Sequence, residues 1–226
     1  MTEFIIAMIV FIASHTIPAY RPWRDALIRR MGAVGYQLFY GTISLAAIAW
    51  LIIAYSAAPH DMLWYPWEWM RWAVVLIMPF SCILLTAGAT SRNPFSIGAG
   101  SDGFNPERPG IVSITRHPLM WALALWSGMH FMANGDAPDL ILFGMFLALS
   151  LFGPVSLDHK RRVKTDDEAL RKLFASTSNI PFAAVLSGRI RPDWRGIGRR
   201  RIIGGLLLYA AILFGHEYVI GISAIP

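Results

Sequence analysis

Three histidines lie within or at the ends of apolar stretches of the chain, where an imidazole is costly to keep unless it is used. His15 interrupts the apolar run that begins FIIAMIVFIAS, while His117 and His130 lie in the stretch ITRHPLMWALALWSGMHFMANGD at residues 114–136. An ionisable side chain inside a membrane span is by default a candidate functional residue. These three imidazoles are therefore the starting point for predicting chemistry.

Their chemistry points to a metal cofactor. Neutral imidazole is the commonest metal ligand in proteins, and two imidazoles that face each other across a helix bundle can hold a six-coordinate haem. A zinc site would need three or four ligands, and the sequence has neither a cysteine cluster nor an HExxH motif. Haem is therefore the predicted cofactor, and aromatic side chains such as Trp126 are candidates to line the porphyrin.

The spacing of the histidines leaves two pairings open. Thirteen residues of helix rise about 20 Å, so His117 and His130 would lie near opposite edges of a bilayer core. On the same helical rise, His117 would lie only about 5 Å deeper than His15, whereas the offset between His15 and His130 would be about 14 Å. Depth alone makes His117 the easier partner of His15, and His130 is the alternative.

Composition shows what kind of elements must position these residues. The chain has 226 residues, of which 55% are hydrophobic and 15% are charged, and its mean hydropathy is +0.48. These values are typical of an integral membrane protein. The sole cysteine, Cys82, cannot form a disulfide within the chain.

Apolar segments of nearly the right length to cross a bilayer recur along the chain. They lie at about 3–20, 35–56, 68–89, 115–133, 138–157 and 201–222. About 20 apolar residues are needed for one helical crossing. We predict an all-α polytopic bundle of about six transmembrane helices that forms a single domain over residues 1–226.

The positive charges predict the orientation. If the N-terminus is outside, the inner segments are 21–34, 90–116 and 158–201, and they hold every Lys and Arg except Arg71. This asymmetry follows the positive-inside rule and predicts a bacterial inner-membrane protein with a periplasmic N-terminus. The net charge of +6 is then explained by topology and by anionic membrane lipids, so nucleic acid is not an expected partner. The sequence does not indicate an oligomeric state.

The inner segments differ in character. Pro22 is placed to start a short helix in the first, and the second is too rich in Gly and Pro to be a continuous helix. The segment 158–200 is the cytosolic or interfacial region, in which Thr165 and Glu168 have the spacing of a capping box before a short amphipathic helix. On the outer side, NGDAP is so short that the helices on either side of it must pack antiparallel, and Asp136 is placed to cap the start of the second of them.

The chain resembles the NnrU family over nearly its whole length. The resemblance rests on HTIPAYRPWRDALIRRMGAVGYQLFYGTISLAAIAWLI, on TRHPLMWALALWSGMHFMANGD, on DHKR, and on IPF at residues 180–182. The family includes proteins linked to nitrite and nitric oxide reduction and is distantly related to the 15-cis-ζ-carotene isomerases.

The resemblance implies a cofactor and a reaction. In the isomerase relatives, haem b is held by histidines that correspond by motif position to His15 and His130, and the haem performs a redox-controlled cis–trans isomerisation of a polyene. The motif therefore favours His130 as the second ligand. A lipophilic polyene substrate or an accessory role in denitrification is what the resemblance implies for this chain.

A second likeness implies a different class of enzyme. GIVSITRHPLMWAL and EALRKLFASTSNIPF are similar to the core of the isoprenylcysteine carboxyl and phospholipid methyltransferases. That likeness implies that S-adenosylmethionine would be held by Arg116, His117 and Glu168. A non-enzymatic scaffold or transporter is the remaining alternative.

Overall fold

The computed structural model describes residues 1–17, 20–95, 103–164 and 167–226, and within these ranges the chain is all-α apart from an isolated bridge between Met62 and Asp136. The chain forms two compact units. The first contains residues 1–63 and 136–142, and the second contains residues 64–135 and 143–226. The single domain predicted over residues 1–226 stays a prediction, and each unit is described by itself.

The first unit is a helical hairpin. Helix α1 (Thr2–Thr16) buries one face, formed by Phe4, Ala7, Met8 and Phe11, whose spacing of three and four residues is that of a helix stripe. Helix α2 (Arg21–Ser56) packs against it in the opposite direction. The antiparallel pairing is fixed near one end by Trp50 Nε1, which donates to Glu3 at 3.3 Å, and is continued by the His15 and Tyr40 rings, whose centroids are 6.2 Å apart.

Helix α2 begins as predicted but is longer than expected. A proline lies in its first turn, as the sequence indicated for Pro22, and the helix is interrupted at Gly32, where φ is +74° and ψ is 168°. This backbone conformation is readily available only to glycine. Gly32 therefore separates the short basic helix predicted at residues 21–34 from the apolar helix that follows it.

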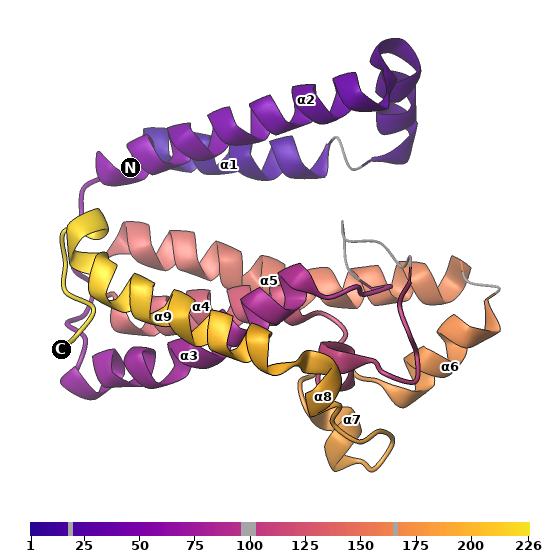
Figure 1. The fold of residues 1–226 in the computed structure, drawn as a ribbon. Helices are drawn as coiled ribbons and strands as arrows, with labels where there is room; N and C mark the ends of the chain where they lie inside the picture. Colours follow the sequence, from indigo (N-terminus) through magenta and orange to yellow (C-terminus); the bar gives the residue numbers. More distant parts are fainter. Residues whose placement is uncertain (18–19, 96–102, 165–166) are drawn as a thin grey trace. The chain divides into compact units, whose positions relative to one another are not determined.

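The second unit is built on four long helices. These are α3 (Glu68–Thr90), α4 (Pro118–Ala133), α5 (Ala137–Lys164, from residue 143 onward) and α9 (Arg199–Ile220) (Figure 1). Helix α3 packs on both α4 and α9. At the contact with α9, a side chain on Gly205 would come within 2.6 Å of the Ile83 Cα, so the close approach of these two backbones requires glycine.

Helices α4 and α5 are antiparallel, as the short NGDAP link predicted. The Trp126 ring contacts the rings of Phe143 and Phe146 with centroids 5.1 and 5.8 Å apart. Near the far end of the pair, a side chain on Gly153 would lie 3.1 Å from Met120 Cε. The link itself acts as predicted, because an Asp136 carboxylate oxygen accepts the backbone N–H of Asp139 at 2.8 Å and so caps the start of α5.

Short elements complete one end of the second unit. They are η1 (Gly110–Ser113), α6 (Glu168–Ser176), α7 (Ala183–Leu186) and α8 (Trp194–Ile197). The cap of α6 is Asp167, whose carboxylate accepts the N–H groups of Ala169 and Leu170. The capping box predicted at Thr165 lies outside the described residues, and the observed cap is two residues later.

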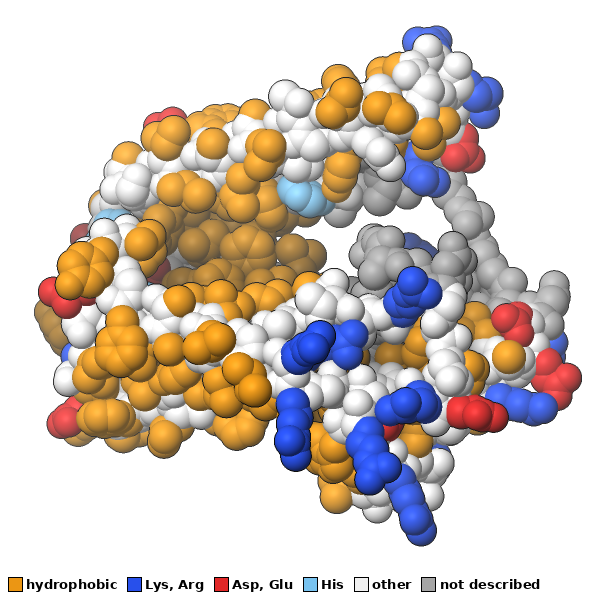
Figure 2. Space-filling model, in the orientation of Figure 1, with side chains coloured by type: hydrophobic (Ala, Val, Ile, Leu, Met, Phe, Trp, Pro, Cys, Tyr) orange, Lys and Arg blue, Asp and Glu red, His pale blue; other side chains and the backbone are white. Residues whose placement is uncertain are grey.

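The surface is that of a membrane protein. Within the described ranges, four helices are long and apolar enough to cross a bilayer, at Pro22–Ser56, Glu68–Thr90, Ala137–Arg162 and Arg199–Ile220. Large apolar side chains on these helices are exposed, among them Leu207 and Phe214 on α9, and Figure 2 shows hydrophobic side chains over the long helices with Lys and Arg gathered near α7 and α8. Helices α1 and α4 have 15 and 16 residues, so the predicted total of six spans stays a prediction.

Candidate functional site

A buried polar cluster of the second unit joins Arg116, His117 and Asp158. Arg116 donates to Asp158 Oδ2 from Nε at 3.0 Å and from Nη2 at 2.6 Å. His117 Nε2 lies 2.7 Å from Asp158 Oδ1. Because a carboxylate only accepts hydrogen bonds, the Nε2 atom of His117 carries the proton. The carboxylate therefore binds the arginine with one oxygen and the histidine with the other.

The local sequence explains why Arg116 and His117 face inward. Pro118 starts α4, and the Thr115 hydroxyl accepts the His117 N–H at 3.2 Å. Residues 109–118 are all buried. This segment is therefore not a surface loop, because it passes through the core of the unit and needs internal partners for its backbone.

Those partners come from one segment later in the chain and one segment earlier in it. The Arg116 N–H donates to the Ser178 carbonyl at 2.9 Å, and Arg116 Nη1 donates to the Thr177 carbonyl at 2.7 Å. From the other side, Asn93 Nδ2 donates to the Arg116 carbonyl at 2.9 Å. Asn93 and Thr177 are themselves almost completely buried. The arginine is thus held through its side chain and through both of its backbone groups.

The IPF segment that carries part of the family resemblance belongs to the same assembly. The Phe182 N–H donates to the Ile114 carbonyl at 2.9 Å. Phe182 adopts a left-handed backbone with φ of 61°, which is unfavourable for a residue with a bulky side chain. This strained turn is maintained where the chain returns to the segment before Arg116.

The electrostatics of the cluster are those of a buried ion pair. The side chains of Arg116 and Asp158 are 5% and 11% exposed. Burial lowers the pKa of the Arg116 guanidinium from its usual value, and the hydrogen bonds to Asp158 act in the opposite direction. The guanidinium nevertheless stays charged in this position, since arginine is effectively always protonated in proteins.

His15 and His130 make the same kind of hydrogen bond as each other, and it differs from that of His117. His15 Nδ1 lies 2.8 Å from the carbonyl oxygen of Phe11, and His130 Nδ1 lies 2.8 Å from that of Trp126. Each carbonyl belongs to the residue four positions earlier in the same helix. Because a carbonyl only accepts, each Nδ1 carries a proton, and in a neutral ring Nε2 then presents its lone pair.

Both imidazoles lie among aromatic rings. The His15 ring centroid is 4.3 Å from that of Phe11 in the first unit. The His130 centroid is 5.4 Å from Trp126 and 5.0 Å from Phe143 in the second unit. The structure therefore brings the predicted residues Trp126 and His130 together, as it does Arg116 and His117, while His15 belongs to the other unit.

The sequence reasoning missed Asp158, Asn93 and Thr177. Asp158 was assigned to the start of the soluble segment 158–200, but α5 continues to Lys164 and carries it as a helical residue. A signal was available in GPVSLDHKRR, where a single acid follows an apolar run and precedes a basic cluster. An acid at that position indicates an ion pair at the end of a span.

The residues that the methyltransferase likeness implies for S-adenosylmethionine have different partners in the structure. The guanidinium of Arg116, which would meet the carboxylate of that cofactor, already binds Asp158. Glu168 pairs with Lys172 at 2.9 Å, and both side chains are 76% exposed. Among the described residues, no group of three or more His, Cys, Asp or Glu side chains is arranged to hold a metal ion.

Comparison with known proteins agrees with this architecture. The long apolar helices and the polar clusters define a polytopic helical membrane protein. The chain belongs to the NnrU protein family, whose model matches residues 3–224. No curated protein and no solved structure matches the chain.

Proposed function

We propose that this NnrU-family chain is a haem b protein of the membrane, in which His15 and His130 would each supply an imidazole to the iron. The observation that carries the proposal is the bond that each Nδ1 makes to the carbonyl four residues earlier, at 2.8 Å in both helices. Histidine ligands of metals usually donate the second ring N–H to a backbone carbonyl or carboxylate, which fixes the tautomer and the ring orientation. In both side chains Nε2 is left as the nitrogen that would bind iron.

The same reasoning favours His130 over His117 as the partner of His15. His117 uses Nε2 to donate to Asp158 at 2.7 Å, so iron ligation through that nitrogen would break a buried hydrogen bond to a charged group. That loss is unfavourable by about 1.5–3 kcal/mol. His130 makes no comparable demand, because its carbonyl bond uses the other ring nitrogen.

The protein side chains around the ligands would hold and shield the group. Phe11 and Tyr40 beside His15, and Trp126 and Phe143 beside His130, offer apolar ring surfaces suited to a porphyrin. A bound haem would supply reversible one-electron chemistry, whose potential depends on the axial ligands and on burial. In an apolar site within the membrane, the substrate class that follows is a lipophilic small molecule.

Two activities are consistent with that chemistry. The first is a redox-controlled cis–trans isomerisation of a lipophilic polyene of the 15-cis-ζ-carotene type. The second is an accessory role in nitrite or nitric oxide reduction. The distribution of Lys and Arg supports a location in the bacterial inner membrane with the N-terminus in the periplasm.

An absorption spectrum tests the haem proposal directly. The full chain, purified in a neutral detergent from cells supplied with a haem precursor, is expected to show a Soret band. His15→Ala and His130→Ala are each expected to remove or shift that band, because each would take away one imidazole that binds the iron. His159→Ala is the control, since it removes an exposed histidine of α5.

The result can also contradict the proposal. A wild-type protein that stays colourless after haem reconstitution would exclude haem binding. A wild-type spectrum in both His15→Ala and His130→Ala would show that other groups hold the iron. Once haem is established, incubation with a cis polyene, followed by chromatographic separation of the isomers, distinguishes the isomerase from the accessory role.

A further inference from the structure

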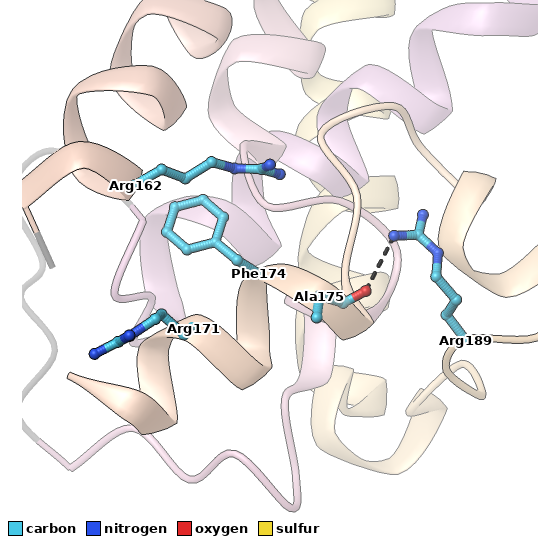
Figure 3. A pocket seen from close by; sticks show the side chains of 5 residues that line it. All are labelled: Arg162, Arg171, Phe174, Ala175 and Arg189. Carbon is cyan, nitrogen blue, oxygen red and sulfur yellow. Dashed lines mark hydrogen bonds between the residues drawn. The ribbon is translucent and has the colours of Figure 1, made fainter. Parts of the chain in front are cut away.

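A pocket lined by arginines lies at the end of the second unit that contains α6. It has a volume of about 350 Å³ and is lined by Arg162, Arg171, Phe174, Ala175 and Arg189 (Figure 3). The three arginines come from different parts of the chain, namely the end of α5, helix α6 and the segment after α7. The volume is within the range of small-ligand sites.

Neighbouring groups orient two of these arginines. The Arg162 guanidinium carbon lies 5.0 Å from the centre of the Phe174 ring, and Figure 3 shows its side chain extended across that ring. Arg189 donates to the Ala175 carbonyl at 3.1 Å and to the Ser187 hydroxyl at 2.9 Å. An arginine that is already held in place loses less side-chain entropy when it binds an anion.

The pocket shares Phe174 and Thr177 with the buried cluster, whose one carboxylate already has its own partners. The Phe174 ring is contacted by Arg116 as well as by Arg162, at 5.2 and 5.0 Å, and the Thr177 carbonyl accepts from both Arg116 and Arg189. The carboxylate of Asp158 already binds Arg116 and His117. The positive charges of Arg162 and Arg189 add to burial in lowering the pKa of Arg116.

A ligand that brings negative charge would relieve this concentration of positive charge. We propose that the pocket of Arg162, Arg171 and Arg189 binds a phosphate group, which several guanidinium N–H groups can meet in the paired geometry that arginine favours. Arg162 lies at the end of a stretch of α5 that is long and apolar enough to cross a bilayer. The phosphate therefore belongs either to the headgroup of an anionic lipid or to a free phosphate compound. This site is separate from the proposed haem ligands and does not depend on them.

Two binding measurements on the full chain in neutral detergent distinguish these sources. In the first, inorganic phosphate and pyrophosphate are titrated by calorimetry. In the second, phosphatidylglycerol and phosphatidylcholine are added and the retained lipid is counted by native mass spectrometry. A lipid headgroup site retains phosphatidylglycerol over phosphatidylcholine, whereas a free phosphate site gives a saturable heat with phosphate or pyrophosphate.

A charge-matched pair of variants tests the location. The double variant Arg162→Gln, Arg171→Gln is expected to bind whichever probe is retained about tenfold more weakly, since each partly exposed ionic contact contributes a few-fold. The control is Arg199→Gln, Arg200→Gln, which removes the same charge from exposed positions at the start of α9. Arg189 is left unchanged because it holds the Ala175 carbonyl.

Each outcome decides the matter. Loss of binding in the pocket variant and retention in the control support the proposal. Equal weakening in both variants would mean that only the overall charge attracts the probe, and the pocket would not be a site. Absence of binding for all four probes to the wild-type chain would overturn the proposal, as would wild-type binding by the pocket variant.

Discussion

The Arg116–His117–Asp158 cluster and the pair of His15 and His130 show two different uses of histidine in one membrane chain. In the cluster, His117 donates from Nε2 to Asp158 at 2.7 Å, and its side chain is only 2% exposed. At His15 and His130 the bond is made by Nδ1, to a carbonyl of the same helix. The cluster satisfies its own polar groups, whereas the other two imidazoles keep Nε2 directed away from their own backbone.

This difference suggests a way to distinguish histidines that stabilise the fold from histidines that could bind a ligand. A ring whose outer nitrogen is bound to an internal carboxylate contributes mainly to stability, since its loss leaves a buried charge with fewer partners. A ring whose inner nitrogen is bound to its own helix leaves the outer nitrogen without a backbone bond, and metal-binding histidines have the same arrangement. Stability and cofactor binding should therefore respond to different substitutions.

The largest expected effect is that of Asp158→Ala. This change leaves the Arg116 guanidinium and the His117 N–H without their common acceptor in a buried position, so we expect a loss of about 3–5 kcal/mol in the free energy of unfolding. Unfolding in mixed detergent micelles measures it. Glu107→Ala, at an exposed acid of the same unit, is the control, and an equal loss in both variants would contradict the assigned role of Asp158.

A smaller loss is expected for His117→Ala. Asp158 keeps both hydrogen bonds from Arg116, so only one bond to a charged group disappears, at about 2 kcal/mol. The same unfolding measurement reports the loss, while the haem spectrum should remain that of the wild type. A protein of normal stability that loses its Soret band would instead identify His117 as an iron ligand.

His15→Ala and His130→Ala are expected to reverse that pattern. In haem-free protein each removes one bond to a backbone carbonyl and the contacts of one ring with its aromatic neighbours, so the free energy of unfolding should fall by about 1–2 kcal/mol. The visible spectrum should change strongly in both. A loss of stability as large as that of Asp158→Ala, measured without haem, would place these residues with the structural cluster.

The smallest effect is expected at Glu168, which pairs with Lys172 on the exposed face of α6. Glu168→Gln should change the free energy of unfolding by less than about 0.5 kcal/mol, because exposed ion pairs contribute little. It should also leave haem binding unchanged. If the wild type binds S-adenosylmethionine and this variant does not, the methyltransferase alternative would replace the haem proposal.

Helix positions could be predicted well where apolar length determines them. Helix α3 was expected at residues 68–89 and spans Glu68–Thr90, and α9 was expected at 201–222 and spans Arg199–Ile220. The Asp136 cap and the antiparallel α4 and α5 also follow from local sequence. Membership of the NnrU family, expected from the motifs, is confirmed over residues 3–224.

The site was harder to predict, because its partners are far apart in the sequence. Arg116 and His117 were identified from their motif, but their carboxylate is 42 residues beyond Arg116. Hydropathy placed the end of the fifth span at residue 157, and helix α5 continues to Lys164 because a helix need not end where its apolar surface does. Asn93 is an uncharged residue in a segment rich in glycine and proline, so no periodic pattern marked its hydrogen bond to Arg116.

The order of these partners along the chain has a consequence for biosynthesis. Asn93 and Arg116 leave the ribosome first, Asp158 follows, and Thr177 and Phe182 come last. The guanidinium of Arg116 therefore has no carboxylate partner until α5 has been synthesised. It has no carbonyl partner until the segment after α6 has been synthesised. A nascent chain stopped before residue 158 would carry an arginine without its carboxylate partner, so the Pro118 end of α4 can be completed only after α5 has been made.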